Sequence, residues 1–180
     1  MSSAAAIAAL NERPLSRREA RGTLVVVDIA DMQVATGPTD VLVTYGLGSC
    51  IAVCVWDPTK SVGGMVHYML PLSKGNPAKA EAKPAMFGDT GIPMLFRAMY
   101  DLGCRREDLI IKVAGGGSIL DNEGFFNIGN RNHTIARKLL WKNGFMVTAE
   151  DVGGTKSRTV RLRVSDGYCV VQSRGEELEL

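Results

Sequence analysis

The sequence predicts an α+β protein in which mixed, mostly antiparallel sheets carry two main helices on one side. Short runs rich in β-branched residues, which are typical of strands, recur along the chain. Turn-forming residues lie between many of these runs and indicate local antiparallel connections. Two longer stretches space their apolar residues as helices do. Helices gathered on one side of antiparallel sheets define the α+β class.

About seven or eight strands are expected, each a short apolar run bounded by turn residues. Gly37-Pro38 and Asp57-Pro58 are typical turn pairs, and Pro71 ends one of the runs. Residues 73–87 contain Pro, Gly, Lys and Ala without periodicity and are expected to form a long mobile loop. The expected strands are residues 24–27, 41–45, 51–56, 65–70, 109–114, 145–150, 159–164 and 168–171.

Both expected helices have terminal signals as well as an apolar stripe. Thr90 is the expected N-cap of the first helix, which places Pro93 in the first turn, where its missing N–H costs little. Gly103 ends this helix. The second helix begins near residues 129–130 and ends at Gly144, with lysines in its last turns that favour the negative end of the helix dipole.

The chain is expected to fold as one domain. Its 180 residues are enough to bury a sizeable core. Residues 1–22 are Ala-rich and then charged, without an amphipathic period, and are expected to be a flexible N-terminal extension. Residues 23–173 are the predicted domain, and residues 174–180 are expected to be a C-terminal tail.

Composition excludes several classes of protein. The 21 Lys and Arg residues nearly balance the 19 Asp and Glu residues, so the chain lacks the basic excess of a nucleic-acid binder. No apolar run approaches the ~18 to 20 residues that a membrane span needs, and no basic region precedes the Ala-rich N-terminus as in a signal peptide. We therefore expect a cytoplasmic protein without direct membrane insertion.

Cysteine usage fits a cytoplasmic protein without a metal site. The four cysteines are not expected to form disulfides in that compartment. Cys50 and Cys54 have tolerable ligand spacing, but no second pair of ligands follows them. No metal ion and no organic cofactor is expected.

The sharpest signal for chemistry is the bend Gly46-Leu-Gly-Ser-Cys50. A nucleophile must be exposed, rigidly aimed and close to backbone N–H groups that can stabilise an oxyanion. Cys50 is therefore the candidate nucleophile, and the backbone at Gly48 and Ser49 is the candidate oxyanion site. Spacing alone also allows a tight strand connection followed by a small buried cysteine. Ser49 is a weaker candidate nucleophile, because a thiol ionises more readily than a hydroxyl.

His67 is the candidate general base for Cys50. It lies in an apolar run, and a neighbouring strand could bring it within hydrogen-bond reach of the thiol. Thr44, six residues before Cys50, could accept a hydrogen bond from the ring and fix its tautomer. The alternatives are a satisfied core histidine and a surface threonine. His133, the other histidine, is expected to face solvent.

Two further polar segments are weaker candidates for chemistry. The run Ala114-Gly-Gly-Gly-Ser118 lacks the Lys-Ser/Thr of a phosphate-binding loop and is expected to be a sharp turn or a pocket wall. Residues 127–132 are expected to cap the second helix and to tie down loops.

The chain resembles the CheD family, the bacterial and archaeal chemoreceptor glutamine deamidases. The resemblance extends over residues 23–171 and rests mainly on two long motifs in their order and separation. The matching segments are Thr44-Tyr-Gly-Leu-Gly-Ser-Cys50, Gly63-Gly-Met-Val-His67-Tyr-Met-Leu-Pro71, Gly115-Gly-Gly117, Ile128-Gly-Asn-Arg-Asn132 and Asp151-Val-Gly-Gly154 with Arg158.

The resemblance implies a three-layer α/β/β sandwich and a catalytic triad of Cys50, His67 and Thr44. It implies that specific glutamines on the cytoplasmic helical bundle of methyl-accepting chemotaxis receptors are converted to glutamate with release of ammonia, as part of chemotaxis adaptation. Some relatives additionally bind a CheC-type chemotaxis phosphatase. The alternative function is a regulatory binding module for that phosphatase or receptor with little catalysis. A third is a general thiol hydrolase acting on small amides.

Overall fold

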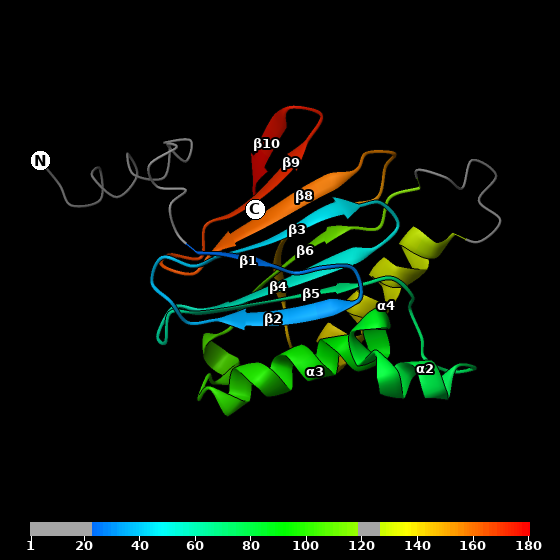
Figure 1. The fold of residues 1–180 in the computed structure, drawn as a ribbon, viewed down its shortest axis with the longest axis horizontal. Helices are drawn as coiled ribbons and strands as arrows, with labels where there is room; N and C mark the ends of the chain where they lie inside the picture. The colour runs from blue at the N-terminus through cyan, green and yellow to red at the C-terminus, as the bar shows by residue number, and fades with distance from the viewer. Residues whose placement is uncertain (1–22, 119–126) are drawn as a thin grey trace, which may run out of the picture.

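The computed structural model describes residues 23–118 and 127–180. This part of the chain forms three layers: helices, an inner sheet and an outer sheet (Figure 1). The arrangement confirms the predicted α+β class and the α/β/β sandwich with mixed, mostly antiparallel sheets. The flexible extension expected at residues 1–22 lies outside the described residues.

The inner sheet has the strand order β2-β5-β4-β6-β7. Its pairs are antiparallel except β6 with β7, and α4 (Ile128–Lys142) supplies the crossover that this parallel pair requires. The central strands β4 and β5 are almost wholly buried, because helices cover one face of the sheet and the outer sheet covers the other. The strands are β2 (Asp31–Ala35), β5 (Val62–Tyr68), β4 (Ile51–Asp57), β6 (Ile110–Gly115) and β7 (Val147–Val152).

The outer sheet has the order β1-β3-β8-β9-β10, and only β1 with β3 is parallel. Residues 174–180, expected to be a tail, instead contain β10, which pairs with β9. All four residues of β10 are exposed and three of them are acidic, so the strand lacks apolar alternation and carries the charges typical of a sheet edge. The strands are β1 (Leu24–Val26), β3 (Val41–Leu47), β8 (Arg158–Arg163), β9 (Cys169–Ser173) and β10 (Glu176–Glu179).

Three further differences concern the inner sheet. Strand β5 begins at Val62 and ends at Tyr68, three residues and two residues earlier than expected. Strand β2 was not predicted, because Asp31 and Gln33 interrupt its apolar residues. Strand β7 begins at Val147, two residues later than expected. The preceding Phe145 does not belong to the strand; its ring stacks on Phe96 of a helix, with 4.3 Å between the ring centroids.

The helical layer consists mainly of α3 (Gly88–Asp101) and α4. Thr90 is not the N-cap of α3: the helix begins two residues earlier, and the Thr90 hydroxyl donates to the Pro84 carbonyl. The earlier start brings Gly88 into the helix at a point of close packing, because a Cβ on Gly88 would lie 2.6 Å from the Ile135 side chain of α4. Pro93 consequently lies inside the helix rather than in its first turn.

The expected loop 73–87 contains two short helices, α2 (Pro77–Ala82) and the 3₁₀ turn η2 (Pro84–Met86). Helix α2 buries no residue, so its sequence lacks the apolar stripe from which a helix is predicted. The start of the segment is fixed by Ser73, whose N–H and hydroxyl both donate to the Asp89 carboxylate. A third short turn, η3 (Arg106–Asp108), follows α3.

Two apolar cores lie between the three layers. The first lies between the helices and the inner sheet, where Val53 of β4 packs with Leu95 of α3. The second lies between the two sheets and includes Leu42, Met65 and Leu162. The predicted site residues lie at the edge of this second core.

Candidate active site

Cys50 and His67 lie diagonally across a pair of inner-sheet strands. Cys50 directly precedes β4, on which Ala52 pairs with His67 of β5. Side chains two residues apart on a strand point to the same face, so the Cys50 and His67 side chains are diagonal neighbours. Ala52 belongs to the core between the sheets, with Cys50 packed against that core, so this face points toward the outer sheet.

Thr44 of the outer sheet reaches across to His67 and fixes its tautomer. The Thr44 Oγ1 atom lies 2.8 Å from His67 Nδ1 and 2.7 Å from the Val27 carbonyl oxygen. A hydroxyl has one hydrogen, and the Val27 carbonyl can only accept, so the Thr44 hydroxyl donates to Val27. Nδ1 must then carry the ring hydrogen and donate it to Thr44. The lone pair of neutral His67 is therefore on Nε2.

The environment of His67 favours its neutral form. The residue is fully buried, and this burial lowers its pKa to about 4, although the negative charge of Asp28 opposes the effect. Its Nε2 atom has no hydrogen-bond partner among the described residues. His67 thus has an unprotonated, unpaired nitrogen at neutral pH, which is the state that a general base requires.

Cys50 is a free, partly exposed thiol. Burial raises its pKa, and a hydrogen bond from its own backbone N–H opposes this effect. Since burial also lowers the pKa of His67, both groups favour their neutral forms before substrate binds. The arrangement therefore suits a thiol that loses its proton during attack rather than a resting thiolate–imidazolium pair.

The bend before Cys50 leaves its N–H groups available. Gly46 adopts φ +67°, a conformation that favours glycine. Among the described residues, the N–H groups of Gly48, Ser49 and Cys50 donate to no backbone carbonyl, whereas the carbonyls of all three accept hydrogen bonds. The three carbonyls are thus held by the fold while the three N–H groups lack a backbone partner, and the Cys50 N–H interacts with its own thiol. N–H groups placed in this way suit an oxyanion site.

Asn132 of α4 holds the nucleophile and base segments together. Its Nδ2 atom donates to the Ser49 carbonyl at 2.9 Å and to the Met69 carbonyl at 2.8 Å. The residue is fully buried, and Tyr68 donates its hydroxyl hydrogen to the Asn132 backbone carbonyl at 2.6 Å. The prediction that this segment ties down loops is confirmed, but the sequence did not indicate that the loop carries Cys50.

The glycine run after β6 forms a wall against the bend. Gly117 N–H donates to the Gly48 carbonyl and Gly116 N–H donates to the Cys50 carbonyl, each at 2.7 Å. The approach requires glycine, because a Cβ on Gly115 would lie 2.1 Å from the Cys50 carbonyl oxygen, and Gly115 adopts φ +115°. The segment is thus a wall of the site, as predicted.

Arg158 holds the loop that contacts this wall. It is nearly fully buried and makes two hydrogen bonds to Asp151, at 3.0 and 3.2 Å. Burial raises the pKa of the Asp151 carboxyl, but hydrogen bonds from Arg158 and Lys156 outweigh burial, so the net pKa is lowered. The loop shaped by this pair presents the Gly154 carbonyl to Ser118 N–H at 2.8 Å.

His133, the other histidine of the chain, lies outside this cluster. His133 on α4 is partly exposed, and its Nε2 lies 3.1 Å from a Glu150 carboxylate oxygen.

The described residues contain no group of three or more His, Cys, Asp or Glu side chains arranged to hold a metal ion. Within the same residues, no helix is long and apolar enough to cross a membrane.

Comparison with known proteins shows the family of the chain. The sequence model of a family described as CheD chemotactic sensory transduction matches residues 69–173. A protein of Syntrophus aciditrophicus named probable chemoreceptor glutamine deamidase CheD 1 is 51% identical over 154 residues, which cover 86% of this chain and 96% of that protein. A protein of Thermotoga maritima named chemoreceptor glutamine deamidase CheD is 39% identical over 157 residues, covering 86% of this chain and 96% of the relative. This chain belongs to the CheD family.

Proposed function

We propose that this chain is a chemoreceptor glutamine deamidase in which Cys50 is the nucleophile and His67 the general base. The names of its relatives support the reaction and the substrate. The observation that carries the assignment of residues is the fixed tautomer of His67, whose Nδ1–H is committed to Thr44 while Nε2 stays unpaired beside the Cys50 segment.

The first half of the reaction forms a thioester. As the Cys50 Sγ attacks the side-chain carboxamide carbon of a substrate glutamine, Nε2 of His67 takes the thiol proton. The developing oxyanion accepts hydrogen bonds from backbone N–H groups of the bend, at Gly48, Ser49 and Cys50. When the C–N bond breaks, protonated His67 returns that proton to the leaving nitrogen, and ammonia departs.

The second half releases the product. A water molecule attacks the thioester carbon, and His67 takes one of its protons through the same Nε2. The C–S bond breaks, His67 gives the proton to Sγ, and the free thiol is restored. Glutamine and water are thereby converted to glutamate and ammonia, and no step draws on a metal ion or an organic cofactor.

Burial of the pair affects the timing of proton transfer. Burial disfavours both the Cys50 thiolate and the His67 imidazolium. The proton therefore moves from Cys50 to His67 while the sulfur attacks, and not before. Thr44 stabilises the imidazolium through Nδ1, which is its positioning role.

We extend the proposal to the location of the reaction and to a second partner. The reaction takes place in the cytoplasm, where the resemblance puts the substrate glutamines. A CheC-type phosphatase is a second partner, and co-purification of the two proteins at stoichiometric ratio tests this point.

The deciding experiment measures ammonia released from the cytoplasmic domain of a cognate receptor. Wild-type protein and Ser49→Ala are expected to release ammonia, with the mass change of deamidation at defined receptor glutamines, whereas Cys50→Ala is expected to release none. Cys104→Ala is the matched control, since Cys104 is a buried free cysteine elsewhere in the fold. If the wild-type protein bound receptor but released no ammonia, its function would be that of a regulatory binding module and not of an enzyme. Equal rates on free glutamine would indicate a general amide hydrolase.

A further inference from the structure

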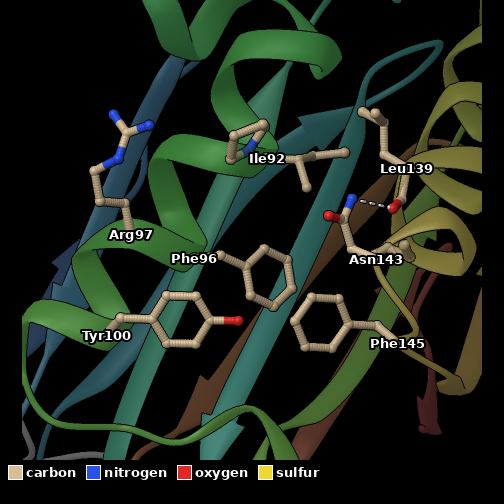
Figure 2. Close-up of a pocket in the computed structure, with 9 residues that line it drawn as sticks. Ile92, Phe96, Arg97, Tyr100, Leu139, Asn143 and Phe145 are labelled. Atoms are coloured by element: carbon tan, nitrogen blue, oxygen red, sulfur yellow. Dashed lines mark hydrogen bonds between the residues drawn. The ribbon is translucent and has the colours of Figure 1, made fainter.

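An apolar groove lies between α3 and α4, on the face of the inner sheet opposite to the site. Phe96 and Tyr100 of α3 line it on one side, Leu139 of α4 on the other, and Phe145 lies at one end (Figure 2). The Phe96 and Phe145 rings stack with 4.3 Å between their centroids. The hollow has a volume of about 270 Å³, slightly below the ~300 to 1,000 Å³ of small-molecule sites, so single side chains suit it better than a cofactor.

A second hollow adjoins the first at α4. Its volume is about 530 Å³, and it shares Leu140 and Phe145 with the first. Trp141 and Met146, which also line it, are 81% and 83% exposed. Large apolar side chains exposed to this extent beside adjoining apolar hollows are typical of protein interaction surfaces.

The charges along this groove all have one sign. The charged residues that line the two hollows are Arg97, Arg137 and Lys138. In the described part of the chain, Arg97 and Lys138 form no ion pair, and Arg137 is 3.7 Å from Glu150. The surface therefore combines apolar hollows with a basic rim, in which Arg97 and Lys138 have no ion-pair partner among the described residues and Arg137 is paired with Glu150.

We propose that the α3–α4 groove binds an acidic amphipathic helix of a partner protein. Apolar side chains three or four positions apart on a helix lie about 5 to 6 Å apart, so one helix can place successive apolar residues in two adjoining hollows. Acidic residues beside this apolar stripe would meet Arg97, Arg137 and Lys138, which gives specificity and faster association.

Two other occupants fit the surface less well. A second copy packed through the same face would bring identical basic rims together, since a twofold interface repeats each residue of the patch. An anionic membrane would meet the basic residues and Trp141, but it would leave the concave hollow beside Phe96 and Tyr100 unfilled. Both occupants are outcomes of the test.

The surface is separate from the catalytic cluster but shares α4 with it. Asn132, near the start of α4, holds the Ser49 carbonyl, and Trp141 follows nine residues later on the same helix. At 1.5 Å per residue the two positions are about 13 Å apart along the helix axis. Binding at the groove can therefore be measured independently of deamidation.

Trp141 provides the readout, because the chain has two tryptophans and the other, Trp56, is paired through its indole N–H to the Val164 carbonyl. A designed peptide with a Leu stripe and Glu on its polar face is titrated into the full-length Trp56→Phe protein. We expect a saturable blue shift of Trp141 emission that weakens with salt. A peptide of the same Leu stripe with Lys in place of Glu is expected not to bind.

Variants locate the binding surface. Tyr100→Ala and the double substitution Arg97→Glu/Lys138→Glu are each expected to weaken peptide binding at least about tenfold, the loss typical of an interface anchor. Leu178→Ala and Arg174→Glu are matched controls, since both residues are exposed and lie at the β9–β10 hairpin of the outer sheet. Both controls are expected to bind the peptide as wild type does.

Three results would overturn the proposal. Equal affinity for the Glu and Lys peptides would remove the role of charge. A concentration-dependent dimer in sedimentation, lost on Tyr100→Ala, would assign the groove to a second copy. Blue-shifted Trp141 emission with phosphatidylserine vesicles, but not with the Glu peptide, would assign the face to a membrane surface.

Discussion

Thr44 accepts the Nδ1 hydrogen of His67 at 2.8 Å, and it can do so only because its own hydroxyl hydrogen is donated to the Val27 carbonyl at 2.7 Å. The contact links the two sheets, since Thr44 is on β3 and His67 is on β5. A threonine in the interior of one sheet thus determines which nitrogen of a histidine in the other sheet is free to take a proton.

Thr44→Val is expected to lower kcat/KM roughly 10- to 100-fold. Valine has nearly the same shape, but it leaves the Nδ1–H of buried His67 without an acceptor, and an unpaired buried donor costs about 1–3 kcal/mol. The rate of ammonia release from receptor measures the loss. Thr44→Ser keeps the hydroxyl and is expected to retain most of the activity; equal losses in both variants would show that the methyl group, not the hydrogen bond, is required.

Acidification is expected to destabilise the protein through His67. The pKa of its imidazole is lowered from 6.5 in the unfolded chain to about 4 in the folded protein. Between these values the unfolded chain binds more protons, so stability is fully present above the unfolded pKa and is lost as pH falls toward about 4. The loss attributable to His67 is about 2 kcal/mol between about pH 7 and about pH 5.

Urea unfolding at the two pH values measures this contribution. His67→Gln is expected to lose less stability on acidification than wild type does. His133→Gln is the matched control, because it removes the other histidine, which lies on the surface side of α4. A wild-type pH dependence in His67→Gln would assign the acid sensitivity to other groups.

The sequence predicted the strands around the site because they are buried on both faces. Strands β4 and β5 are continuous apolar runs, and the glycine bend between β3 and β4 is visible as a motif. The candidates Cys50, His67 and Thr44 follow from these runs and from the resemblance to a family. Their proximity could not be derived, because it depends on Thr44 being in one sheet and His67 in the other.

The elements that were missed lack an apolar pattern. Strand β10 is acidic and exposed along its whole length, and β2 has polar residues at Asp31 and Gln33. The role of Asn132 was missed in detail for another reason: its bond to Ser49 spans 83 positions in sequence, and no local spacing indicates a contact of that range.

Asn132→Leu is expected to lower kcat with little effect on KM. Leucine removes the two hydrogen bonds that hold the Ser49 and Met69 carbonyls, so the nucleophile segment is no longer fixed relative to the base. Misplacement by about 1 Å can cost on the order of 100-fold in rate. Steady-state kinetics on protein confirmed as folded by circular dichroism measures the split. Asn143→Ala, which removes an exposed bond to Leu139 at the other end of α4, is expected to keep the wild-type kcat; a similar loss there would indicate general loosening of the helix.

Gly115→Ala is expected to damage the site by direct collision. A Cβ at this position would lie 2.1 Å from the Cys50 carbonyl oxygen, and φ +115° is a conformation that other residues rarely adopt. Gly175→Ala separates the two effects, because Gly175 adopts φ +84° but has no atom within 4 Å of the point that a Cβ would occupy. Gly175→Ala is therefore expected to cost only about 1–2 kcal/mol, the penalty for the backbone conformation. Gly115→Ala is expected to cost clearly more in urea unfolding and to lose ammonia release in whatever fraction remains folded. If the two variants unfolded at the same urea concentration and Gly115→Ala kept its activity, the glycine wall would not be what positions Cys50.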